Sequence, residues 1–171
     1  VFSGFETVNI NATTGTAATD STVVFATAAD TSAINVTGTA DVVTTLTSTK
    51  STGVTVISTT TGDFTATGNV AANSSITSGA GADALTMSTT NGSTYNSGAG
   101  VDTITTVVAG LVATGVNDHT VNGGDGTDIL ASTSALLAGY TTPSTLTISN
   151  FETLSVTDAL GSSLTAATVQ A

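Results

Sequence analysis

Short runs of alternating apolar and polar residues recur along the chain, and each run is too short for a typical helix. Thr, Val and Ala alternate in segments such as TVVFATA (22–28) and VTVIS (54–58). This period of two places every second side chain on the same face of a β-strand. Such runs centre on Ile10, Ile34–Val36, Val54–Ile57, Ile76, Tyr95, Val121 and Leu146–Ile148. The pattern therefore predicts short strands that begin about 20–25 residues apart.

This spacing is close to the length of one coil of a parallel β-solenoid. Each coil of a solenoid leaves backbone groups unpaired above and below until another coil stacks on it. We therefore expect an all-β fold, a single parallel β-solenoid (β-helix or β-roll) over residues 1–171 with coils of about 19–26 residues. An antiparallel β-sandwich also has short strands at even spacing and is the alternative.

The composition agrees with a fold made of strands. The 171 residues include 41 Thr and 19 Ser, whereas Leu, Glu, Lys and Arg are scarce. Because Thr and Val are β-branched and favour extended backbone, we expect almost no α-helix. The absence of Cys from the sequence excludes disulfides and thiol chemistry.

The charge balance narrows the classes of partner. The chain has a formal net charge of −11, and its only Lys or Arg is Lys50, which we expect to be solvated. Binding to nucleic acid requires several cationic side chains, so it is not expected. Membrane insertion is not expected either, because no apolar run approaches the roughly 20 residues that span a bilayer. Divalent cations, other protein surfaces and glycans remain as partners.

One turn sequence recurs three times without gaps. The segments are ITSGAGADALT (76–86), YNSGAGVDTIT (95–105) and VNGGDGTDILA (121–131), and each has Gly-x-Gly-x-Asp between apolar positions. The aspartates Asp83, Asp102 and Asp128 follow one another at steps of 19 and 26 residues. Since a sandwich has no reason to repeat one turn in register, the repetition favours the solenoid.

The residue types in this turn suit a hard cation. Glycine permits positive φ and close backbone approach, so alternating glycines can direct successive carbonyl oxygens at one point. Ca²⁺ takes six to eight oxygens at about 2.3–2.6 Å from carboxylates and carbonyls. One turn offers about half of such a shell, so three stacked turns predict two cations, one between each neighbouring pair. The alternative is that the turns are tight corners without metal.

The three segments resemble the GGxGxDxUx nonapeptide of RTX proteins, in which U is a large apolar residue. VNGGDGTDILA matches every fixed position, whereas the other two segments have Ser78 and Ser97 at the first glycine. The resemblance implies a calcium-binding β-roll over residues 76–131, with carboxylates from Asp83, Asp102 and Asp128. It implies further backbone ligands from the surrounding turn residues, which are Gly79, Ala80, Gly81, Gly98, Ala99, Gly100, Gly124, Asp125 and Gly126.

Two departures from the RTX pattern affect what we expect. RTX nonapeptides follow one another directly on both sides of each coil, whereas here they occur once per coil. The 26-residue step also contains an insertion, TVVAGLVATGVNDH (106–119), and the calcium site between Asp102 and Asp128 depends on this insertion bulging outward as a loop. The only His of the chain, His119, would lie at the exposed tip of this loop. The side chain of Asp125 occupies a variable position, where we expect it to face solvent.

A second motif occurs near both ends of the chain. SGFETVNI (3–10) and SNFETLSV (149–156) share Phe-Glu-Thr and contain the only two glutamates, Glu6 and Glu152. We expect the Phe side chain to fill the core at the start of a strand and the Glu carboxylate to accept hydrogen bonds from backbone N–H groups. A calcium ligand is the alternative role for Glu. The return of the motif predicts that residues 147–171 begin a second repeat that echoes residues 1–25.

Gly-Asp turns followed by a Phe-Glu-Thr strand, in a Thr-, Ala- and Val-rich chain without Cys, resemble the RTX-type surface-layer proteins of Gram-negative bacteria. The resemblance implies type I secretion, calcium-dependent folding outside the cell and self-assembly into a lattice or filament on the bacterial surface. A calcium-rigidified stalk or adhesin module of a larger secreted RTX protein is the alternative. A cell-surface glycan is a further candidate partner.

Two further expectations follow from the sequence. The chain begins within a strand-like pattern at Val1, so we expect a fragment or a processed product. We do not expect an enzyme, because the sequence contains one His, two Tyr and no Trp or Arg. Enzymes that act on polysaccharides usually need aromatic and basic residues to bind the sugar.

Overall fold

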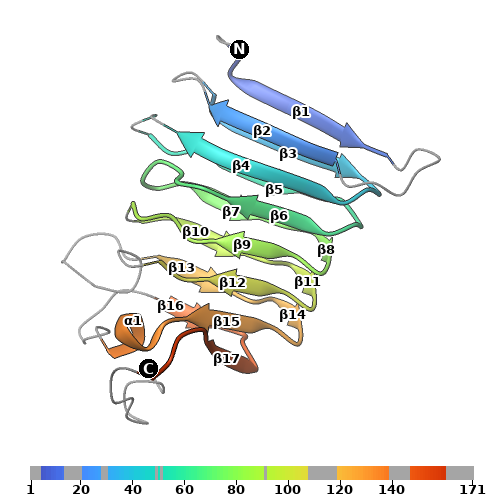
Figure 1. Cartoon of the computed structure of the whole chain (residues 1–171). Coiled ribbons are helices and arrows are strands. Elements are labelled where there is room, and N and C mark those ends of the chain that lie inside the picture. The colour runs from blue at the N-terminus through green and yellow to red at the C-terminus, as the bar shows by residue number, and fades with distance from the viewer. Residues whose placement is uncertain are drawn as a thin grey trace.

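The structure, a computed structural model, describes residues 5–13, 21–27, 31–48, 50, 52–90, 92–107, 119–138 and 147–160. Within these ranges the chain forms a parallel β-solenoid with almost no helix, so the expected fold class is confirmed. The coils stack along one axis, with β1 at one end and β17 at the other (Figure 1).

Two seven-stranded parallel sheets form the long faces of the solenoid. The first sheet contains, in spatial order, β1 (Thr7–Ala12), β3 (Ala33–Gly38), β5 (Thr55–Ser58), β7 (Ser75–Thr77), β10 (Thr94–Asn96), β13 (Thr120–Asn122) and β16 (Thr147–Ser149). The second contains, from the opposite end, β17 (Thr153–Val156), β15 (Ile129–Ser132), β12 (Thr103–Thr105), β9 (Ala84–Thr86), β6 (Phe64–Thr67), β4 (Val42–Ser48) and β2 (Ser21–Thr27). Each predicted run with a described centre lies in a strand of the first sheet or directly beside one.

A narrow third sheet connects the two faces at one corner. It consists of β8 (Ala80–Gly81), β11 (Ala99–Gly100) and β14 (Asp125–Gly126), in the order β14-β11-β8. These are the strands of the three Gly-x-Gly-x-Asp turns. The parallel stacking of whole coils therefore brings the three turns into one column, as the repeated motif predicted (Figure 1).

The core lies between the two long faces and is built from columns of equivalent residues. The inward column of the first sheet places one side chain of each coil directly above the next. This column contains Val8, Ile34, Val56, Ile76, Tyr95, Val121 and Ile148. Its five inner members are at most 2% exposed. The apolar residues that follow the turns, Leu85, Ile104 and Leu130, form the facing column in the second sheet.

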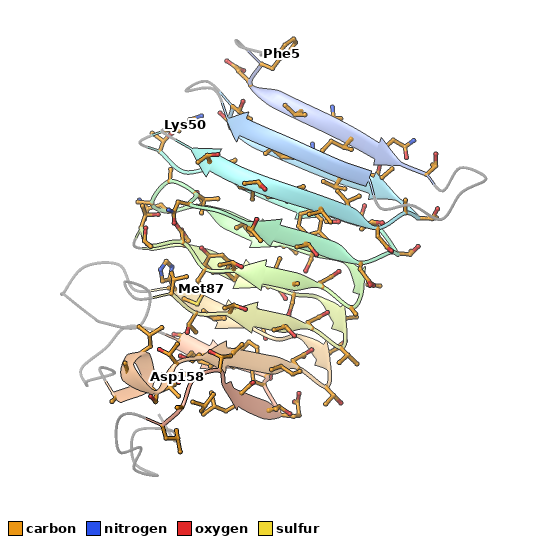
Figure 2. All side chains as sticks on the ribbon, viewed as in Figure 1. Phe5, Lys50, Met87 and Asp158 are labelled. Atoms are coloured by element: carbon orange, nitrogen blue, oxygen red, sulfur yellow. The ribbon has the colours of Figure 1, made fainter. Side chains whose placement is uncertain are left out.

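A single short helix, α1 (Ser134–Ala138), lies in the described part of the chain after β15. The Thr133 hydroxyl accepts the Leu136 N–H at 3.3 Å as an N-cap, and Leu136 itself is buried in the core. The Asp158 carboxylate accepts the Ser134 N–H at 2.7 Å and the Ser134 hydroxyl at 3.0 Å. The backbone bond in particular lowers the pKa of Asp158. Asp158 thus fastens the helix to the segment after β17 (Figure 2).

Candidate functional site

The three Gly-Asp turns are in exact backbone register. Ala80 pairs with Ala99 and Ala99 with Asp125, while Gly81 pairs with Gly100 and Gly100 with Gly126. The insertion between the second and third turns does not disturb this register, although its residues 108–118 lie outside the described ranges.

Close stacking of the turns explains why the second glycine of each motif is required. Gly100 has φ +145°, and a Cβ there would lie 1.8 Å from the Gly81 carbonyl oxygen. Gly126 has φ +148°, and its Cβ would lie 1.7 Å from the Gly100 oxygen. A side chain at either position would both strain the backbone and separate the coils. The glycines therefore have a structural role that does not depend on any ligand.

The motif aspartates form a ladder of hydrogen bonds that runs along the solenoid. Asp83 Oδ1 accepts the Phe64 N–H at 2.7 Å, and Asp102 Oδ1 accepts the Asp83 N–H at 2.8 Å. Asp128 Oδ1 accepts the Asp102 N–H at 2.9 Å, and Glu152 Oε2 accepts the Asp128 N–H at 2.7 Å. Each carboxylate thus binds the backbone of the preceding coil. We call these four residues, Asp83, Asp102, Asp128 and Glu152, the carboxylate ladder.

The second oxygen of each aspartate in the ladder is unsatisfied. Asp83 is 2% exposed, and Asp102 and Asp128 are 0% exposed. Their Oδ2 atoms are buried and have no hydrogen-bond partner in the described structure. A buried, unpaired polar atom costs roughly 1–3 kcal/mol, and more when it is charged. The turn column therefore contains three sites at which a positive charge would be favourable.

Burial also raises the pKa of two members of the ladder, Asp83 and Asp102. It raises the pKa of Asp83, although the hydrogen bond from the Phe64 N–H opposes this effect. The pKa of Asp102 rises to about 6, first through burial and then through repulsion by the charges of Asp83 and Asp128. Ionisation of Asp83 and Asp102 is therefore less favourable here than in water, and a nearby positive charge would offset this cost.

The protein's own cation does not supply that charge. The Lys50 ammonium donates a hydrogen bond to the Ser32 hydroxyl, next to the start of β3. The turns follow the ends of the parallel strands β7, β10 and β13, so Lys50 lies at the opposite side of the sheet. Figure 2 shows Lys50 on that side of the solenoid. A counter-charge for the ladder would have to come from solution.

Several predicted carbonyl ligands also take part in the pairing of the turns. The Gly79 oxygen accepts the Ala99 N–H, and the Gly98 oxygen accepts the Asp125 N–H, both at 2.8 Å. A carbonyl oxygen has two lone pairs, so one remains for a further contact.

Asp125 is exposed, as expected from its variable position. The described ranges contain no group of three or more His, Cys, Asp or Glu side chains that could hold a metal ion. A cation here would therefore depend on carboxylates from neighbouring coils together with backbone oxygens.

The serines at the first motif position connect successive turns. The Ser78 hydroxyl donates to the Ser97 oxygen at 2.8 Å, and the Ser97 hydroxyl donates to the Gly123 oxygen at 2.5 Å. These two departures from the RTX pattern therefore have a role in stacking. Gly123 has no hydroxyl, so the third turn has no such bond to the coil that follows it.

Two asparagines of the turns were missed by reasoning from the sequence. Asn96 Oδ1 accepts the Gly98 N–H, and Asn122 Oδ1 accepts the Gly124 N–H, each at 3.2 Å. Both side chains close the start of a turn in the same way. Their recurrence at the second position of two motifs was the available signal.

The C-terminal Phe-Glu-Thr motif adopts the role predicted for it. Phe151 packs against the core, and Glu152 accepts a backbone N–H as the last member of the ladder. The N-terminal motif differs in its phenylalanine, because Phe5 is 53% exposed beyond β1 (Figure 2), whereas the side chains of Glu6 and Glu152 are both exposed. One motif precedes β1 in the first sheet and the other precedes β17 in the second. The interpretation of residues 147–171 as a second repeat stays a prediction.

The expectation for His119 was wrong. Its side chain is 1% exposed and packs edge-on against Tyr95, with ring centroids 5.7 Å apart. Its Nδ1 lies 3.1 Å from the Ser93 nitrogen and 3.2 Å from the Ser93 oxygen. His119 directly precedes β13, so strand pairing draws it into the core although it ends a polar Asn-Asp-His sequence.

No model of a known protein family, no curated protein and no solved structure matches the chain. Among the residues that the structure describes, no helix has the length and apolar character needed to cross a membrane.

Proposed function

We propose that the protein is a structural, calcium-dependent, self-assembling extracellular protein, such as a subunit of a bacterial surface layer or surface filament. The observation that carries this proposal is the column of three buried aspartates, each with an unsatisfied Oδ2, in stacked glycine turns. The protein's only Lys lies elsewhere, so a cation from solution is the natural counter-charge.

Calcium fits this donor set because it prefers carboxylate and carbonyl oxygens and tolerates irregular geometry. Asp83 and Asp102 would contribute to one position, and Asp102 and Asp128 to another, together with backbone oxygens of the turns. Bound calcium supplies positive charge. The chain's own residues hold the coils in register, and neutralising the ladder removes the repulsion that opposes this register.

This arrangement would couple folding to secretion. Free calcium is low inside cells and high outside, so the ladder would acquire its counter-charge after export. Selective binding to the folded state stabilises it by RT ln(1 + [L]/Kd), about 2.7 kcal/mol per site at a hundredfold excess over Kd. This is a large part of the usual 5–15 kcal/mol stability of a domain.

Self-association, or the stacking of a further coil of a longer chain, would use the strand edges at the two ends of the described solenoid. β1 and β2 at one end, and β16 and β17 at the other, each pair with one neighbouring strand only. Unpaired edges of this kind favour pairing with another chain. The edge strands β1 and β2 of one chain could therefore pair with β16 and β17 of another chain, and the two solenoids would stack end to end.

The experiment is a calcium titration of calcium-free protein, followed by circular dichroism and light scattering on the same sample with an EGTA control. We expect β signal and scattering to rise together with calcium. A gain of β signal without scattering would favour the stalk or adhesin module instead. A β signal that ignores both calcium and EGTA would refute the proposal and leave the turns as corners without metal.

A further inference from the structure

The coil after the third turn crosses between the sheets by a shorter route. Asn122 pairs with Ser149, and Ile129 pairs with Thr153, so residues 123–128 stand opposite residues 150–152 alone. Glu152 takes the position of the motif aspartate, and its carboxylate still reaches the Asp128 N–H at 2.7 Å. The additional methylene of Glu provides reach that Asp would lack in this shorter turn.

Two oxygens converge beside Gly123 at this junction. A Cβ on Gly123 would lie 1.9 Å from the Asn150 carbonyl oxygen and 2.9 Å from Asp128 Oδ2. Both oxygens therefore lie within 2.9 Å of one point beside Gly123, and they come from different coils. Asp128 Oδ2 is buried without a hydrogen-bond partner, so a positive charge between it and the Asn150 carbonyl oxygen would be favourable.

The backbone of Asn150 is held in a conformation that maintains this approach. Its φ of +56° lies in the left-handed region, which is uncommon for residues other than glycine but is tolerated by Asn. The Asn150 side chain donates to Asn122 Oδ1 at 2.7 Å, which fastens the short turn to the coil before it. The carbonyl is thus positioned by contacts that do not involve Asp128.

We propose that the Asp128–Glu152 interval is a third divalent-cation position, formed by Asp128 Oδ2, the Asn150 carbonyl and the Glu152 carboxylate. Calcium takes oxygens at about 2.3–2.6 Å, a distance that allows one ion to contact oxygens converging on a single point. This inference rests on the proposed function. The inference extends the proposed function by assigning a calcium-ligand role to Glu152, the glutamate of the C-terminal Phe-Glu-Thr motif. The ion would fasten the terminal strand β17 to β15.

The test counts bound calcium per chain by equilibrium dialysis, which is insensitive to assembly. Glu152→Gln keeps an oxygen that can accept the Asp128 N–H but removes the charge. Glu6→Gln is the matched control, because it makes the same change in the same tripeptide at an exposed site outside the ladder. We expect Glu152→Gln to bind one calcium ion fewer per chain than the wild type, and Glu6→Gln to bind the same number.

The outcomes separate this inference from the proposed function. If folded Glu152→Gln bound as many calcium ions as the wild type, the proposed third position would be refuted. The two positions between Asp83, Asp102 and Asp128 would be unaffected. A wild-type chain that binds no calcium would overturn both. If Glu152→Gln lost its β signal in calcium, the number of ions bound by the wild-type chain would decide. Three ions per chain support the inference, and two ions per chain overturn it.

Discussion

The raised pKa values of Asp83 and Asp102 predict that the calcium-free protein loses stability as pH rises. The pKa of Asp102 is about 6 in the folded protein, compared with 3.8 for a free side chain. The folded state therefore binds more protons than the unfolded state between these values, so the free energy of unfolding falls as pH increases through this range. Since one pKa unit corresponds to 1.36 kcal/mol, Asp102 alone accounts for roughly 3 kcal/mol over the whole range.

This loss of stability is best measured at pH values where the protein keeps most of its net negative charge. Between about pH 5 and pH 7, Asp102 should contribute roughly 1 kcal/mol of this loss, and Asp83 adds to it in the same direction. Urea denaturation followed by circular dichroism, in buffers stripped of calcium beforehand, measures the free energy of unfolding at each pH. Linear extrapolation to zero urea gives the free energy of unfolding in water at each pH, and these values are then compared.

Matched variants separate the ladder from the general effect of net charge. Asp102→Asn removes the buried carboxylate and should reduce the pH-dependent loss by roughly 1 kcal/mol. Asp125→Asn removes an equal charge from an exposed position of the same turn column and should leave most of the loss in place. Equal pH dependence in the two variants would refute the reasoning, because the loss would then reflect overall charge alone.

Two further predictions concern the stacking of the coils, and both are measured by urea denaturation in calcium. Gly100→Ala should destabilise the protein by about 3 kcal/mol or more, because a left-handed φ costs about 1–3 kcal/mol and the Cβ would overlap the Gly81 oxygen. The neighbouring exposed substitution Val101→Ala should change stability by less than about 0.5 kcal/mol, and a similar value for Gly100→Ala would contradict the stacking argument. Tyr95→Phe should cost about 1–3 kcal/mol, because the Tyr95 hydroxyl accepts the buried Ser88 N–H at 2.6 Å. Tyr95→Phe with wild-type stability would show that water or another group satisfies this N–H.

Much of the fold could be predicted from local sequence patterns. Alternation of Thr with Val or Ile predicted that each strand has one inward face, and the structure places Ile34, Val56 and Ile76 in one inward column. The repeated Gly-x-Gly-x-Asp turns predicted parallel stacking in one column of corners, which is also confirmed. These features were accessible because strand period and turn chemistry act between residues that are close in sequence.

The direction in which the carboxylate ladder runs could not be predicted from local sequence patterns. Each carboxylate binds the coil before it, and Glu152 joins the three aspartates despite lacking the glycine motif. His119 was placed wrongly for a related reason. Its polar neighbours indicated a loop tip, but the pairing of β10 with β13 carries it into the core against Tyr95.

The sequence by itself determined that the chain forms short strands, that similar corners recur, and that a motif aspartate accompanies each corner. Only the tertiary structure decided which backbone amide each carboxylate binds, which oxygens are left buried without a partner, and where Asn150 meets Asp128. The physical reason is that these contacts join residues 19 to 26 positions apart along the ladder. Their geometry depends on the length and register of whole coils. The insertion lengthens one coil without changing the motif, and the last turn is shorter and lacks the glycine motif.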